Sequence, residues 1–132
     1  MQKSKRVESF YFPVTPVAKG RPRFSKFGGA YTPKKTRDAE KELRDLAVLC
    51  KCKPFENAIC VTISFSMPRP KSVTRRYHTI KPDADNLVKG VCDALNGVLY
   101  TDDAQIIELH VKKFYTDAAN PVGICLTIEE VE

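Results

Sequence analysis

The segment AICVTISFSM at 58–67 alternates apolar residues with small ones, and it constrains the fold more than any other stretch. This alternation predicts a strand with one buried face. The residues of that face are Ile59, Val61, Ile63, Phe65 and Met67. A lone strand cannot bury such a face, so the remaining chain must supply more strands and a covering layer of helices.

Two segments, 32–51 and 85–97, repeat apolar residues at three- and four-residue steps. This predicts two amphipathic helices, one before and one after the strand in the sequence. Asn96-Gly97 is a stop signal for the second helix. The expected caps are Thr32, with Pro33 in the first helical position, and, for the second helix, Asp85 or Asn86.

Further strands are predicted from alternation at 8–15, 105–115 and 122–129. In the second of these, one face is expected to carry Ile107, Leu109, Val111 and Lys113. Residues 19–32 predict a basic loop or loose hairpin, and 68–82 a long loop with three prolines. The order predicts an α+β fold, a single domain over 1–132 with a mixed sheet of about four strands and two or three helices packed against it.

Composition narrows the class of protein. The sequence has no apolar stretch long enough to span a bilayer and no apolar signal region, which predicts a cytoplasmic protein. The five cysteines are scattered, which predicts reduced and mostly buried thiols. The net charge is +6, and residues 1–37 carry ten Lys and Arg against the single acid Glu8. Clustered positive charge of this kind is typical of nucleic-acid binding, although a solvated basic face has the same composition.

Negative charge is concentrated in the segment 81–105. Its carboxylates are Asp83, Asp85, Asp93, Asp102 and Asp103. Hard cations such as Mg²⁺ take carboxylate oxygens together with substrate phosphate oxygens, and a bound metal assists phosphodiester hydrolysis. An acidic cluster within a basic chain therefore indicates metal-dependent phosphodiester chemistry. Taken singly, the same residues also fit a helix cap, a surface ion pair and a turn.

The spacing of these acids raises a geometric question. Asp85, Lys89 and Asp93 follow at four-residue steps and share one helix face. At 1.5 Å per residue, roughly 18 Å of helix separates Asp85 from Asn96 at the helix end. Asp102 and Asp103 follow that end in the sequence. Either the turn before them reaches back along the helix, or the carboxylates meet across a subunit interface.

The segment KPDADNLVKGVCDALNGVLYTDDAQI resembles the signature of the RusA family of Holliday junction resolvases, which occurs in bacteria, phages and prophages. The pattern KPD-x-DN-x-x-K, then D-x-L-N-G, then DD-x-Q is present in order. KGRPRF at 19–24 and YTPKKT at 31–36 resemble the family's N-terminal half, so the resemblance covers roughly 10–115.

This resemblance implies a homodimeric, Mg²⁺-dependent endonuclease that binds four-way DNA junctions and nicks two strands symmetrically. It implies that Asp83, Asp85 and Asp103 are catalytic acids and metal ligands, and that Lys89 is a catalytic lysine. It also implies that Asp102 is a neighbour of the catalytic Asp103, and that Asp93 has a structural or peripheral role. Mn²⁺ suits oxygen ligands as well as Mg²⁺ does.

We expect the basic segments to bind the phosphates of the junction arms, with an affinity that falls steeply with salt. The expected contacts are Lys19, Arg21, Arg23, Arg69, Lys71, Arg75, Arg76 and Lys81. The loop 68–82 shows no apolar anchors, which predicts that it is mobile without DNA. His78 and His110 are interpreted as ordinary polar residues.

Two alternatives remain open on the sequence. A non-catalytic protein that binds branched DNA would use the acids as caps and dimer contacts, and would bind tightly without cutting. A metal-dependent nuclease for other substrates, such as flaps or RNA, would cut linear branched molecules as well as four-way junctions.

Overall fold

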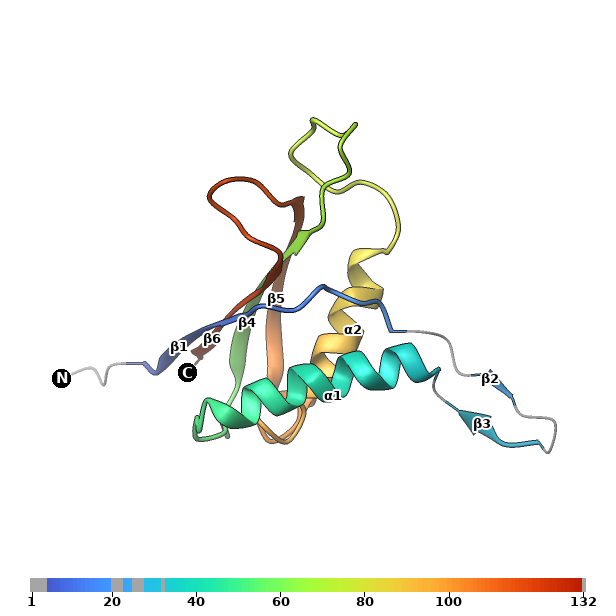
Figure 1. Ribbon diagram of the computed structural model, residues 1–132. Coiled ribbons are helices and arrows are strands. Elements are labelled where there is room, and N and C mark those ends of the chain that lie inside the picture. The colour runs from blue at the N-terminus through green and yellow to red at the C-terminus, as the bar shows by residue number, and fades with distance from the viewer. Residues whose placement is uncertain (1–4, 20–22, 25–27, 32, 132) are drawn as a thin grey trace.

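The computed structural model describes residues 5–19, 23–24, 28–31 and 33–131, and the chain forms one four-stranded sheet with two α-helices (Figure 1). The strands of this sheet are β1 (Val7–Phe12), β4 (Ile59–Met67), β5 (Ile106–Tyr115) and β6 (Gly123–Glu130). The helices are α1 (Lys34–Leu49) and α2 (Ala84–Leu95). A short 3₁₀ turn, η1, spans Asp103–Gln105.

The sheet is mixed, with the strand order β1-β6-β4-β5. β4 is antiparallel to β6 and parallel to β5, so α2 is the crossover helix of a β4–α2–β5 unit. This agrees with the predicted α+β fold. Residues 19–32 contain a separate two-stranded pair, β2 (Arg23–Phe24) and β3 (Ala30–Tyr31), as expected for a loose hairpin.

The core lies between the helices and one face of the sheet. The alternation predicted for β4 is confirmed, because Ile59, Val61, Ile63, Phe65 and Met67 are all buried. They pack with Leu43 and Ala47 of α1 and with Leu87, Val91 and Leu95 of α2. The opposite face of the sheet carries polar residues, among them the exposed Thr62 and Cys125.

The alternation predicted for β5 is wrong at its start. The pairing passes from Ile59 with Ile106 to Cys60 with Glu108, so Ile107 is an extra residue in a β-bulge. Ile106 packs against the core, whereas Ile107 is 58% exposed. Alternation alone does not reveal the inserted residue, because both candidates for the buried face are isoleucine.

The helix starts also differ from the expectation. Thr32 lies outside the described residues, and Pro33 occupies the N-cap of α1 instead of its first helical position. Asp83 is the N-cap of α2, two residues before the first candidate. The backbone carbonyl of Asp83 accepts a 3.1 Å hydrogen bond from Leu87 N, which places the start of the helix earlier than expected. The predicted stop at Asn96-Gly97 is confirmed, since Gly97 has a φ of 78°.

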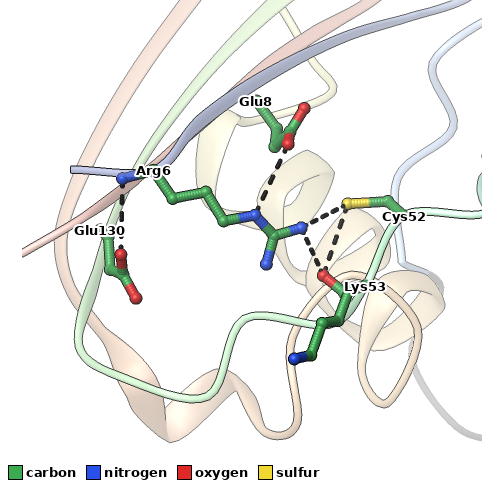
Figure 2. Close-up of polar contacts among 5 residues, drawn as sticks. All are labelled: Arg6, Glu8, Cys52, Lys53 and Glu130. Atoms are coloured by element: carbon green, nitrogen blue, oxygen red, sulfur yellow. Dashed lines mark hydrogen bonds and ion pairs between the residues drawn. The ribbon is translucent and has the colours of Figure 1, made fainter. Parts of the chain in front are cut away.

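Arg6 ties the N-terminal strand to the turn that follows α1 (Figure 2). Its guanidinium donates to the Lys53 carbonyl and to the Cys52 sulfur, and it lies 3.5 Å from Glu8. It also lies 3.9 Å from the ring centroid of the buried Phe55. This arginine is therefore a structural residue. In the described part of the chain, no helix has the length and hydrophobicity to cross a membrane.

Candidate active site

The first pair of acids lies at the N-terminus of α2. Asp83 is the N-cap and Asp85 lies in the first turn, and both side chains are exposed. The partial positive charge of a helix N-terminus favours carboxylates at these positions. Lys113 of β5 fixes the backbone of the segment that precedes them. Its Nζ donates to the carbonyl oxygens of Ile80 at 2.9 Å and Pro82 at 2.7 Å.

Lys113 is a residue that sequence reasoning missed. It lies on the β5 face that turns towards the helices, between Val111 and Tyr115, and it is half-buried. The available signal was a lysine in a position where the alternation predicts an apolar residue. Its hydrogen bonds fix the backbone directly before Asp83, so it positions the acidic pair.

The second pair of acids is held rigidly at the opposite end of α2. Asp102 and Gln105 form a capping box, in which the Asp102 backbone N–H donates to Gln105 Oε1 at 2.7 Å. Gln105 Nε2 donates to the carbonyls of Phe55 and Asn57, both at 2.9 Å. The amide of Asp103 donates to Asn96 Oδ1 at 3.1 Å.

These bonds explain two of the sequence patterns physically. The asparagine of D-x-L-N-G and the glutamine of DD-x-Q both hold the backbone around Asp103. Since the Asp102 carboxylate caps η1, Asp103 is the member of the pair that remains available to a ligand.

The electrostatics at Asp103 favour a bound cation. Burial first, and then hydrogen bonding to Asp102 and the negative charges of Asp102 and Asp93, raise the pKa of the Asp103 carboxyl above its ordinary value. The positive charge of Lys89 opposes this shift. A divalent cation would relieve the repulsion among these carboxylates, and their oxygens suit a hard metal such as Mg²⁺.

The two ends of α2 do not meet within one chain. Among the described residues, the only group of three or more His, Cys, Asp or Glu whose ligand atoms all lie within 4.8 Å is elsewhere, on β4 and β5. Asp103 bonds to Asn96 at the end of the helix, so the turn does not reach back to Asp83 and Asp85.

The N-terminal basic segment lies against the middle of α2. Gly90 makes this possible, because a Cβ at this position would lie 3.3 Å from the Val17 carbonyl oxygen. Lys19 N donates to the Asn86 carbonyl, and the Lys19 Nζ pairs with Glu40 and, at 3.2 Å, with Asp93. The charge of Lys19 is therefore already compensated within the protein, and this residue positions the start of the basic segment.

The other predicted DNA contacts divide into three groups. Arg21 lies outside the described residues, and the side chain of Arg23 in β2 is not described either. Arg69 is used internally, since its guanidinium donates to the carbonyls of Thr116, Val73 and Arg75. Exposed positive side chains remain at Lys71, Arg75, Arg76 and Lys81.

The expectation that the loop 68–82 lacks anchors is wrong. Besides the three bonds of Arg69, Val73 packs against the core and His78 is buried. The His78 amide donates to the Lys113 carbonyl, and its ring lies 5.0 Å from that of Tyr115. Apart from Val73, the anchors are arginine and histidine side chains, which a search for apolar residues does not identify.

His78 should make the stability of this loop depend on pH. Burial first, and then the charges of Lys113 and Arg75, lower its pKa from the ordinary 6.5. Its Nδ1 is buried without a hydrogen-bond partner among the described residues. Because the pKa of His78 is lower in the folded protein than in the unfolded chain, the unfolded chain takes up its proton first as the pH falls through 6.5.

We therefore expect the free energy of unfolding to be highest above pH 6.5 and to decline as the pH falls towards the lower pKa of folded His78. Urea titrations of wild type and His78→Phe, from about pH 7 to about pH 5, should show a smaller decline in the variant. The control His110→Gln removes the other histidine and should behave as wild type, with a chelator present throughout. Parallel curves for wild type and His78→Phe would contradict the expectation.

Comparison with known proteins agrees with the fold and the motifs. The model of the family described as "Endodeoxyribonuclease RusA" matches residues 13–129. The Bacillus subtilis (strain 168) protein "Uncharacterized protein YqaN" is 35% identical over an alignment of 118 residues, which covers 77% of this chain and 83% of that protein. The chain belongs to the RusA endodeoxyribonuclease family. Membership of this family implies a Holliday junction resolvase nuclease activity, which is a hydrolase activity on DNA.

Proposed function

We propose that this protein is a divalent-metal-dependent, structure-specific endonuclease that resolves four-way DNA junctions by paired symmetric nicks. The observation that carries the proposal is the position of two carboxylate pairs, one at each end of α2, with exposed Lys and Arg residues in the loop 68–82 that leads directly to the first pair. The basic side chains would bind the DNA backbone, and the acids would hold the metal beside it.

Each residue of the site has a proposed role. Asp83, Asp85 and Asp103 would hold the metal, which is Mg²⁺ or Mn²⁺ because all three offer only oxygen ligands. A bound divalent cation would supply a hydroxide nucleophile and stabilise the charge on the attacked phosphate. The exposed Lys89, one turn after Asp85, would bind the scissile phosphate or orient the attacking water.

The proposed active unit is a homodimer. On one chain, Asp83 and Asp85 lie at the opposite end of α2 from Asp103, so a metal that needs all three requires a second copy. The exposed Ile107 and Leu109 lie on β5, an edge strand that directly follows η1, and offer an apolar contact for that copy. A two-fold dimer would carry two equivalent sites, which suits paired cuts in a four-way junction.

The test is cleavage of a labelled synthetic four-way junction by the full chain with Mg²⁺. We expect symmetric paired nicks, no cleavage of a linear duplex of the same sequence, and no cleavage when EDTA replaces the metal. A flap and an RNA duplex are the matched substrates for the alternatives. Equal cutting of the flap would indicate a nuclease of broader specificity, and tight junction binding without cutting in any divalent metal would indicate a non-catalytic binder.

A further inference from the structure

A second cluster of metal-binding residue types lies on the face of the sheet away from the helices. Cys60 of β4 and Glu108 and His110 of β5 each offer one ligand atom, and these atoms all lie within 4.8 Å of one another. The alternating residues Ile59 and Val61 face the helices and are buried, which places Cys60 on the opposite face. Glu108 and His110 are exposed, and Cys60 is half-buried.

The strand register brings these three residues together. In the parallel pairing of β4 with β5, Cys60 is opposite Glu108, and Thr62 is opposite His110. Glu108 and His110 are two residues apart on one strand, so their side chains leave the same face. The cluster is therefore set by two neighbouring strands of the sheet, and it does not depend on a loop.

The β-bulge at the start of β5 is what makes the pairing possible. Ile59 pairs with Ile106, so an uninterrupted ladder would place Ile107 opposite Cys60. The inserted residue moves Glu108 into that position instead. Bulges are known to redirect side chains at functional positions. Here the bulge exchanges an isoleucine for a carboxylate beside the thiol.

The donor set differs in chemistry from the aspartate site. Thiolate, imidazole and carboxylate together are ligands of Zn²⁺ and similar transition metals, whereas Mg²⁺ prefers oxygen ligands alone. Zinc–ligand bonds of about 2.0–2.3 Å in a tetrahedron place ligand atoms roughly 3.5 Å apart. Since the three ligand atoms lie within 4.8 Å of one another, each pair would have to approach by at most about 1.3 Å. Glu129 of β6 lies opposite Cys60 in the pairing of β4 with β6, and it adds further negative charge nearby.

We infer that Cys60, Glu108 and His110 bind one transition-metal ion of the zinc type on the open face of the sheet. Three protein ligands leave the fourth position to water. The ion joins β4 to the edge strand β5 directly after the segment that carries Asp103. The site does not depend on the proposed cleavage of junctions, since its residues lie on the opposite face of the sheet from α2.

The inference is tested by titrating the reduced, chelator-treated full chain with Co²⁺ as a spectroscopic probe. We expect a thiolate-to-cobalt charge-transfer band that saturates at one ion per chain and is abolished by Zn²⁺ but not by excess Mg²⁺. Cys60→Ser should lose the band, and His110→Gln should weaken binding by at least about tenfold, since even outer partners of ligands are worth this much. Zn²⁺ should also raise the melting temperature of wild type and not that of Cys60→Ser.

The matched control is Cys125→Ser, which removes an exposed thiol from the same sheet face, outside the cluster. It should keep the band unchanged. Glu108→Gln and His110→Gln alter exposed side chains, so they test the site even if Cys60→Ser does not fold. A band that persists in Cys60→Ser, or that is lost only when Cys50 and Cys52 are replaced, would overturn the inference. Junction cleavage retained by a folded Cys60→Ser separates this outcome from a failure of the proposed function.

Discussion

Asp85→Asn is expected to abolish cleavage of a four-way junction while leaving its affinity for the junction equal or higher. The side chain lies exposed in the first turn of α2, so the substitution removes a proposed metal ligand without opening the core. It also removes a negative charge from a surface that we propose to bind phosphates, which should favour binding in the absence of metal. The single-turnover cleavage rate should fall by at least about a hundredfold, comparable to the loss of one group that stabilises the transition state.

The matched control for this experiment is Asp45→Asn, which makes the same chemical change on the exposed side of α1. Asp45 pairs there with Lys41, one turn away on the same helix, and both side chains are exposed. Its cleavage rate and affinity should equal those of wild type. Retained cleavage in Asp85→Asn would remove this residue from the metal site, and weaker junction binding would mean that the carboxylate contributes to binding directly.

Much of this fold was predictable because burial and periodicity determine it. The alternation of β4 and the apolar steps of both helices require a sheet with helices on one face, and the structure has this arrangement. The bulge at Ile107 was not predictable, because an inserted residue leaves the local composition unchanged. The N-cap at Asp83 was missed for a related reason, since Asp83, Asp85 and Asn86 are all good caps and only the backbone distinguishes them.

The chemistry of individual basic residues was less predictable than their charge. Clustered positive charge is typical of polyanion binding, but it does not show which cations are already paired within the protein. Lys19 forms ion pairs with Glu40 and Asp93, and Arg69 donates three hydrogen bonds to backbone carbonyls. Lys19 is distant in sequence from both of its partners, and Arg69 is distant from Thr116, so these roles depend on the tertiary structure. The exposed Arg75, Arg76 and Lys81 remain the better candidates for phosphate contacts.

The separation of the acids leads to a prediction about subunit composition. If each metal takes Asp83 and Asp85 from one chain and Asp103 from its partner, two inactive variants should restore cleavage when they are combined. In a heterodimer of Asp85→Asn and Asp103→Asn, one site contains both substitutions and the other contains none. We expect each homodimer to be inactive and the purified heterodimer, carrying a different tag on each chain, to nick a junction at a single strand.

The decisive control places both substitutions on one chain and pairs it with a wild-type chain. With shared sites, each site of this heterodimer loses one aspartate, so it should be inactive. If each chain instead forms its own complete site, the wild-type chain should cut and the heterodimer of single variants should not. The two arrangements therefore predict opposite results for the same two heterodimers. A variant that fails to fold would be recognised by its altered junction binding. Since Asn96 and Gln105 hold Asp103 at the far end of α2, the shared arrangement is the one we expect.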